Sequence, residues 1–393
     1  TLENATVPPG GSHLFLLPRR DVDGDSVTDG VDDGEQTGLT RRSFRITSAR
    51  PVAAYQWNPV DDATSMGASL LLPAGRLDGR YRVVGCHPAT SLDPFGLGLS
   101  LNRSYLTVVG MAAETRVSIT PSFAIMAGGE VPAIEAGDTF EATLGPFDVL
   151  NLETAPPPGV FAPMPDLSGT LVDASEPVAV FSGADLALVP LEPVVLPGEE
   201  EADGCCGDHV EGQLWPVSTL GRRHVVGRSP IRSTGSYVEP DYVRVVATEA
   251  GTSVTTSLGH EIAMEAGEVH EMAAAESFVL EASEPVVVGL SLAGGGQTHM
   301  SRIAGDPALL LVPPIEQGLS EVPFLVAGDL PEQWAVVVAA ADDEVTLDGR
   351  SLSSCSGAEH AGELDGTSYV VTWCEIAPGV HLVRGAGPLV VSV

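Results

Sequence analysis

The hydrophobic positions of this chain fall in short, β-branched runs separated by clusters of glycine, proline, serine and aspartate. One example is the run 242–247, which is followed by a turn at 249–251 and by a second run at 252–256. Short runs bounded by turn residues are typical of antiparallel strands with tight connections. No amphipathic helical stretch of useful length is present, so the pattern predicts an all-β fold.

A pattern of two strands separated by a proline occurs four times, and we call each copy a closing segment. Each copy is a strand, a polar break, a proline and a second, more apolar strand. Proline has no N–H to donate, and β-structure tolerates it at the first residue of a strand. We expect the second strand of each copy to be buried. The four closing segments are 44–55, 171–181, 278–288 and 382–391.

A glycine-containing turn precedes each closing segment, whereas two other patterns occur only three times. The turns are 9–12, 135–138, 265–268 and 377–380. The opening segments are 70–85, 214–227 and 311–328, and the middle segments are 105–120, 242–256 and 334–347. With four endings and three beginnings, we expect the first unit to be truncated at its N-terminus. The missing half, and further domains of the same chain, are expected upstream, and without them a strand edge is left unpaired.

The repeats define units of about 80–115 residues, the size of a β-sandwich, whereas a propeller blade has about 40–50 residues. The sequence therefore predicts tandem β-sandwich-like units packed together, and a propeller-like closed β-repeat is the alternative. The predicted division is 1–60 (the C-terminal half of a first repeat), 61–187, 188–300 and 301–393.

Composition and charge exclude two classes of partner. The net charge is −34, from 53 acidic and 19 basic residues, and every basic residue is arginine. Because this charge repels phosphates, nucleic acid is excluded as a partner. No uninterrupted apolar run of about 18 residues occurs, so no membrane span is expected in this segment.

Five cysteines do not form a metal-binding pattern, because no Cys-x-x-Cys pair is present. Cys355 and Cys374 flank a predicted hairpin and are placed to bridge it. The simplest count for Cys86, Cys205 and Cys206 is one further disulfide and one free thiol, with the pairing left open. Five buried free thiols are the alternative.

An aspartate-rich stretch at residues 21–33 has the pattern of a calcium-binding loop. Carboxylates occupy positions 1, 3, 5, 9 and 12, and a backbone carbonyl is available at position 7, as in EF-hand loops. Position 6 is Ser26 instead of glycine and the flanks are strand-like, so the stretch resembles the loops of thrombospondin type 3 and dockerin repeats. We expect structural Ca²⁺, and a solvated acidic hairpin tip is the alternative. The expected ligands are Asp21, Asp23, Asp25, Val27, Asp29 and Asp32.

Catalytic motifs are scarce. No G-x-S-x-G, H-E-x-x-H or P-loop pattern occurs. Asp208, His209 and Glu211 offer a possible metal or catalytic centre, and His87 beside Cys86 offers a thiol nucleophile. For the latter pair, a disulfide or a buried thiol is the favoured interpretation. Asn4 and Asn102 each begin an N-glycosylation pattern. Matches to so short a pattern often occur by chance.

The stretch 205–247 carries a recognisable family pattern. It has a Cys-x-x-Asp-His opening at 205–209, Glu211 and Gln213, a Trp-Pro-Val sequence at 215–217 and Glu-Pro-Asp-Tyr-Val-Arg-Val-Val-Ala at 239–247. A second match lies at 306–317. These motifs resemble the N-terminal domain family of IgGFc-binding proteins. The resemblance makes 208–211 a repeated packing feature. It implies a bacterial, secreted or cell-surface member of binding type, and with the cysteines it favours an oxidising compartment.

These observations lead to three functional hypotheses. The favoured one is a non-catalytic, extracellular binding or adhesion domain that is calcium-stabilised and recognises protein or glycan through surface loops at 155–165, 188–203 and 294–297. The alternatives are a purely structural module of a larger surface or matrix protein, and a hydrolase centred on Asp208, His209 and Glu211. We expect no enzyme activity.

Overall fold

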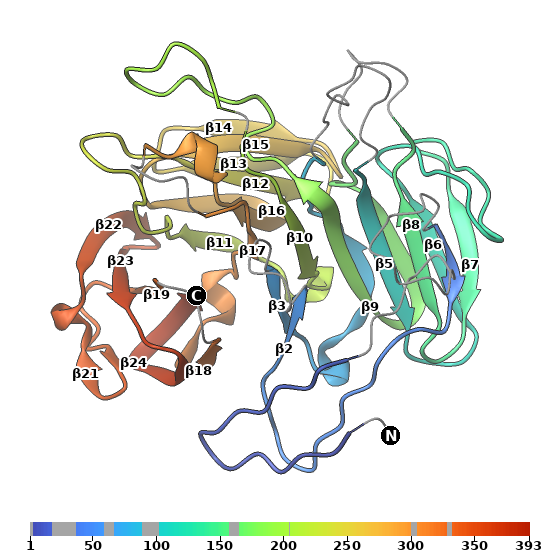
Figure 1. Ribbon diagram of the computed structural model, residues 1–393, viewed down its shortest axis with the longest axis horizontal. Helices are drawn as coiled ribbons and strands as arrows, with labels where there is room; N and C mark the ends of the chain where they lie inside the picture. Colours follow the sequence, from blue (N-terminus) through green and yellow to red (C-terminus); the bar gives the residue numbers. More distant parts are fainter. Residues whose placement is uncertain are drawn as a thin grey trace.

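The fold is built almost entirely from antiparallel strands. The computed structural model describes residues 3–17, 37–58, 67–88, 102–156, 165–203, 205–299, 305–327 and 332–393. In these ranges the helices are five 3-10 turns of three residues each, and none is long or apolar enough to cross a membrane. The predicted all-β fold is confirmed (Figure 1).

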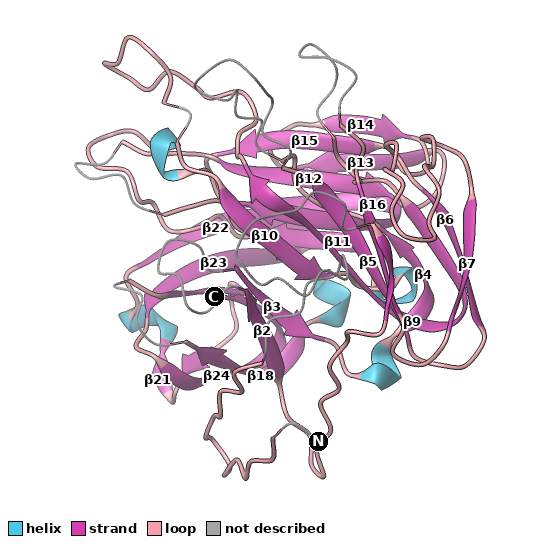
Figure 2. Cartoon of the chain, turned by 45° about the vertical axis from the view of Figure 1, so that its right-hand side comes forward, coloured by secondary structure: helices cyan, strands magenta, loops and turns pink. Residues whose placement is uncertain are grey.

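Three curled sheets follow one another along the chain and make repeated, sandwich-like units (Figures 1 and 2). The first sheet contains β1 (Gly38–Thr40), β4 (Asp78–Arg82), β5 (Ser104–Gly110), β6 (Thr115–Thr120), β7 (Phe140–Leu144), β8 (Val149–Glu153), β9 (Leu171–Ala187) and β10 (Asp208–Gln213). The second contains β11 (Gly221–Val226), β12 (Asp241–Ala247), β13 (Thr252–Thr256), β14 (Glu261–Met264), β15 (Val269–Ala274), β16 (Phe278–Ser291) and β17 (Leu309–Leu311). The third contains β18 (Leu319–Val326), β19 (Trp334–Ala340), β20 (Thr346–Leu347), β21 (Arg350–Ser351), β22 (Gly357–Leu364), β23 (Thr367–Glu375) and β24 (Gly379–Ser392).

The closing segments 171–181, 278–288 and 382–391 lie in the longest strand of each sheet, β9, β16 and β24. The first half of each long strand lies between two neighbours: β4 and β6, β11 and β13, or β18 and β20. The second half pairs with β5, β12 or β19. Pro177, Pro285 and Pro388 have no paired residue in these ladders, and each stands where the partners change. Proline cannot donate a ladder hydrogen bond, which explains this position.

The opening segments also share one local structure. Pro73, Pro216 and Pro314 each precede a 3-10 turn, and their φ angles are −65°, −64° and −68°. The turns are η1 (Ala74–Arg76), η2 (Val217–Thr219) and η4 (Ile315–Gln317), and each leads into the strand that pairs with the closing segment, β4, β11 or β18. Proline fixes φ near this value, so the same turn forms three times.

The N-terminal part of the described chain adds one strand to the first sheet and forms a small two-stranded sheet. β1 pairs with β8 at the edge of the first sheet. β2 (Ala54–Asn58) and β3 (Gly67–Leu71) form a two-stranded ribbon near the centre of the molecule (Figure 1). A backbone hydrogen bond to Tyr55 comes from Leu325 of the third sheet. The predicted boundaries after residues 60, 187 and 300 stay predictions.

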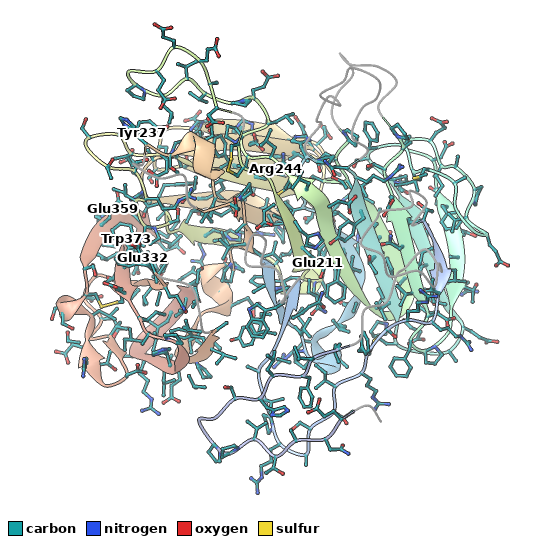
Figure 3. The ribbon with its side chains drawn as sticks, viewed as in Figure 1. Glu211, Tyr237, Arg244, Glu332, Glu359 and Trp373 are labelled. Carbon is teal, nitrogen blue, oxygen red and sulfur yellow. A yellow bond between two sulfur atoms is a disulfide. The ribbon has the colours of Figure 1, made fainter. Side chains whose placement is uncertain are left out.

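The hydrophobic cores cross from one sheet to the next. The largest cluster joins side chains of the first sheet with Val246 and Val287 of the second. Another joins Val225 and Val279 of the second sheet with side chains of the third. At that boundary the indole N–H of Trp373 donates to the Arg228 carbonyl over 2.8 Å (Figure 3). The units are therefore packed against one another, as predicted.

Two disulfides are present. Cys355 and Cys374 are bridged, as the predicted hairpin suggested, and Cys205 is bridged to its neighbour Cys206. Cys86 is a buried free thiol. The expected count of a further disulfide and one thiol is confirmed.

Candidate functional site

Three loops meet at one end of the second sheet, and we call them the loop cluster: residues 188–206, 228–240 and 293–299. The central loop 293–299 holds the other two. Its Ala293 carbonyl accepts from Arg232 Nη2 over 2.6 Å, and its His299 carbonyl accepts from the Thr234 N–H over 2.7 Å. The Gly294 N–H donates to the Val189 carbonyl over 2.8 Å. The described part of the loop 188–206 projects from the body of the molecule (Figure 1).

The Gln297 side chain forms hydrogen bonds to two backbone positions of the loop 188–206, one in each half. Its side chain is buried, and its Oε1 accepts from the Val194 N–H over 2.6 Å while its Nε2 donates to the Asp203 carbonyl over 2.5 Å. Gly296 lets the chains approach closely, because a Cβ there would lie 2.1 Å from the Cys205 carbonyl oxygen. From the sequence, 294–297 is expected to be an exposed surface loop that contributes to binding. That prediction is wrong, since Gly295–Gln297 form a buried 3-10 turn that supports the longer loops.

The loop cluster exposes apolar side chains among carboxylates. Val194, Val195 and Ile231 are each about half exposed. Residues 188–206 include no lysine or arginine, and their exposed carboxylates are Glu192, Glu199, Glu200, Glu201 and Asp203. An apolar centre with a polar rim is the usual composition of a protein–protein contact surface. A loop that is already held in place loses less entropy on binding.

Of the three residues proposed as a hydrolase centre, His209 and Glu211 lie on one face of β10 and Asp208 does not. β10 alternates, so Asp208 lies on the opposite face from His209 and Glu211. Glu211 accepts a hydrogen bond from the Tyr105 hydroxyl over 2.9 Å and another from Gln56 Nε2 (Figure 3). Across the described ranges, no three His, Cys, Asp or Glu side chains are grouped so that they could hold a metal ion.

Burial governs the protonation of this polar cluster. It raises the pKa of Glu211, partly offset by the hydrogen bond from Tyr105, and it lowers the pKa of His209. The Tyr105 hydroxyl lies 3.3 Å from His209 Nε2. Tyr105 also lies directly over Gly183, where a Cβ would meet the hydroxyl at 2.5 Å. The side chains satisfy one another between the ribbon and the first sheet, which is the packing role that the family resemblance implied.

A second buried polar cluster joins the first and second sheets around Arg244 of β12 (Figure 3). Nη1 of Arg244 donates to the Gly85 carbonyl and to Asp166 Oδ2, both over 2.7 Å, and Nε donates to Glu271 Oε2 over 2.6 Å. Burial alone would raise the pKa of Asp166, and Arg244 and His87 hold it below its usual range. In the sequence, Arg244 stands out only as part of the family pattern, and no motif identifies Asp166. The signal for this cluster in the sequence is Arg244 itself, a charged residue within an otherwise apolar strand, which requires a buried partner.

His87 and Cys86 belong to the same region. His87 Nε2 lies 3.6 Å from Asp166 Oδ2, and burial lowers the pKa of His87. Burial raises the pKa of the Cys86 thiol, whose Sγ lies 3.5 Å from Ser291 Oγ. A raised thiol pKa disfavours the thiolate that a nucleophile requires. Cys86 is therefore a packed thiol, the favoured one of the two sequence interpretations.

Several predicted features cannot be placed. The expected calcium ligands Asp21, Asp23, Asp25, Val27, Asp29 and Asp32 lie outside the described residues, and so does most of the loop 155–165. Asn4 is exposed and Asn102 is half-buried.

Comparison with known proteins supplies the family. The family model described as IgGFc binding protein matches residues 67–393. The IgGFc-binding protein of Homo sapiens is 30% identical over 293 residues, which are 73% of this chain and 5% of the human protein. The chain thus spans a small part of that relative's length. No solved structure matches. The expected bacterial origin stays a prediction. Since the family model covers most of the chain and a relative is 30% identical over 73% of it, this chain belongs to the IgGFc-binding protein family.

Proposed function

We propose that this chain is a non-catalytic, extracellular binding domain that recognises a protein through the loop cluster. The observation that carries the proposal is the loop 188–206, which Gln297 holds in place while Val194 and Val195 stay exposed among carboxylates. A preorganised loop with exposed apolar anchors is the arrangement that gives affinity at low entropic cost. Two disulfides fit an oxidising, extracellular compartment.

The Fc region of immunoglobulin G is the first ligand to test, because the human relative is an IgGFc-binding protein. Binding of the wild-type domain to immobilised Fc is measured by surface plasmon resonance, with Fab as the negative ligand. We expect Val194→Asp/Val195→Asp to weaken binding at least tenfold, about 1.4 kcal/mol. The control is Leu319→Asp, which places one aspartate at an exposed apolar position of the third sheet. Unchanged binding by the loop variant would place the contact elsewhere.

Glycan recognition is separated from protein recognition in the same assay. Enzymatically deglycosylated Fc presents the same polypeptide without its sugars. Equal binding to both Fc forms supports a protein ligand, as proposed. Loss of binding on deglycosylation would show that the loop cluster binds the Fc glycan instead of the polypeptide. No binding to any form of Fc, together with no effect of the loop variant on other ligands, would favour a purely structural module.

We also propose that Ca²⁺ stabilises the domain through Asp21, Asp23, Asp25, Val27, Asp29 and Asp32. The support is the alternate spacing of carboxylates, which repel one another unless a hard cation binds them. Calorimetric titration with Ca²⁺ should show one site, and a chelator should lower Tm. Asp23→Ala/Asp25→Ala should abolish both effects, whereas Glu199→Ala/Glu200→Ala, in another acidic stretch, should retain them. Absence of heat at millimolar Ca²⁺ would disprove the site.

A further inference from the structure

Residues 44–53 repeat the closing segment of the three sheets, but two side chains that are buried in every sheet are exposed here. Aligning the four closing segments on their prolines places Ile46 with Val172, Leu280 and Val383, and Val52 with Val178, Val286 and Leu389. Ile46 and Val52 are both 55% exposed. Their equivalents are 0% exposed, except Leu389 at 2%. The first closing segment therefore presents the core-forming side chains of a unit without a core around them.

The three sheets show what covers this position. The equivalent of Ile46 lies between two strands in every sheet, so it has a partner on each side. The pairs are Tyr81 and Ile119 for Val172, His224 and Thr256 for Leu280, and Val322 and Leu347 for Val383. Residues 44–53, all of them described, form no strand. The strand β2 begins directly after them, at Ala54, and pairs with β3.

Exposed apolar side chains are concentrated in the N-terminal part of the described chain. Eight of the fifteen exposed large hydrophobic side chains of the described chain lie at residues 7–52. They are Val7, Leu14, Phe15, Leu16, Leu17, Leu39, Ile46 and Val52.

The charge of the segment is opposite to that of the chain as a whole. Residues 37–58 contain four arginines and no aspartate or glutamate, whereas the whole chain has a net charge of −34. Arg41 is bound to Asp148, and Arg45 lies over the Phe147 ring. Arg50 is exposed at the end of the apolar segment. A carboxylate-bearing partner complements this surface, whereas the same segment of a second copy would bring arginines against arginines.

We propose that residues 44–53 are a docking edge for an extended polypeptide strand of a partner, in which apolar residues alternate with carboxylates. The strand adds to the segment by backbone hydrogen bonds, as β6, β13 and β20 do in the sheets, and its apolar side chains cover Ile46 and Val52. This is a second contact surface, separate from the loop cluster.

The test uses a synthetic peptide that copies residues 250–266, the β13–β14 hairpin. This peptide carries Val254 and Ile262 and two glutamates, Glu261 and Glu265, and it has no lysine or arginine. We expect saturable binding to the wild-type chain by fluorescence anisotropy, with at least tenfold slower hydrogen exchange over residues 44–53. Ile46→Asp/Val52→Asp should abolish both effects, and Leu319→Asp should leave both unchanged. Circular dichroism and Tm show whether each variant is folded. If the Ile46→Asp/Val52→Asp variant is misfolded, the hydrogen exchange of residues 44–53 in the wild-type chain, with and without peptide, decides the test.

Three results would overturn the proposal. The first is no protection of residues 44–53 at saturating peptide. The second is equal binding of a peptide carrying Glu261→Lys/Glu265→Lys, which would remove the role of charge. The third is a concentration-dependent dimer in sedimentation that Ile46→Asp/Val52→Asp abolishes, which would assign the edge to a second copy of this chain.

Discussion

Arg244 and Asp166 form an ion pair across the boundary between the first and second sheets, with 2.7 Å between Nη1 and Oδ2. Both side chains are largely buried, and Arg244 also neutralises Glu271 and satisfies the Gly85 carbonyl. The two sheets therefore share a polar contact beside their common apolar core. Removing either partner leaves the other charge buried without compensation.

Arg244→Met should strongly destabilise the chain, because Asp166 loses its cation while remaining away from water. We expect a loss of about 3–5 kcal/mol in the free energy of unfolding, measured by urea denaturation. The double variant Arg244→Met/Asp166→Asn should recover part of that loss, since neither charge is then stranded. Arg223→Met, which removes a more exposed ion-paired arginine of β11, is the control and should cost much less. Equal losses would show that burial of the pair is unimportant.

His224 should make the fold sensitive to mild acid. Burial lowers the pKa of His224 to about 4 from its ordinary value of 6.5. The unfolded chain therefore binds a proton that the folded chain does not, and stability falls as pH drops from 6.5 towards 4. The contribution is about 3 kcal/mol over that window. His224→Gln should flatten the pH dependence of unfolding by that amount, whereas His360→Gln, at an exposed site, should not. An unchanged slope in His224→Gln would contradict the assignment.

The Cys355–Cys374 disulfide should contribute more to stability than the Cys205–Cys206 disulfide. It joins residues 19 apart, whereas the other joins neighbours. A disulfide lowers the entropy of the unfolded chain by an amount that grows with the logarithm of the loop length. Cys355→Ser/Cys374→Ser should therefore lower the free energy of unfolding by about 3 kcal/mol. Cys205→Ser/Cys206→Ser should cost clearly less. Differential scanning calorimetry of both variants checks the order, and a reversed order would refute the prediction.

Gln297→Ala should loosen the loop 188–206 without unfolding the sheets. Two partly buried hydrogen bonds of the Gln297 side chain are lost, so Val194 and its neighbours should exchange their amide hydrogens at least tenfold faster, about 1.4 kcal/mol of local stability. Gln213→Ala is the matched control. It removes a buried glutamine that accepts from the Leu72 N–H, far along the chain from the loop. Exchange that accelerates equally in both variants would mean that Gln297 does not hold the loop.

Local pattern predicted most of the fold. The alternation of apolar and polar residues with a proline at the break identified what became β9, β16 and β24, because a strand needs only its own periodicity and a proline's missing N–H to be recognised. The glycine turns were found for the same reason. Gly137 and Gly267 adopt φ of +84° and +80°, which glycine takes without strain.

The site depended on contacts between residues that lie far apart in sequence. Tyr105 and Gln56 reach Glu211 from positions more than a hundred residues away, and no spacing rule connects them. The run Gly294–Gln297 looks flexible in isolation. It is buried because the loop 188–206 folds over it and the missing side chains let Cys205 approach.

Ile46 and Val172 share one sequence pattern but differ in burial, which the sequence alone does not determine. Both occupy the same place in the same repeated pattern, and the sequence by itself determined that each belongs to an apolar strand segment with a proline five residues later. Only the tertiary structure decided that Val172 is covered and Ile46 is exposed. Strand periodicity is a property of one segment, whereas burial is a property of its neighbours, and those neighbours come from elsewhere in the chain.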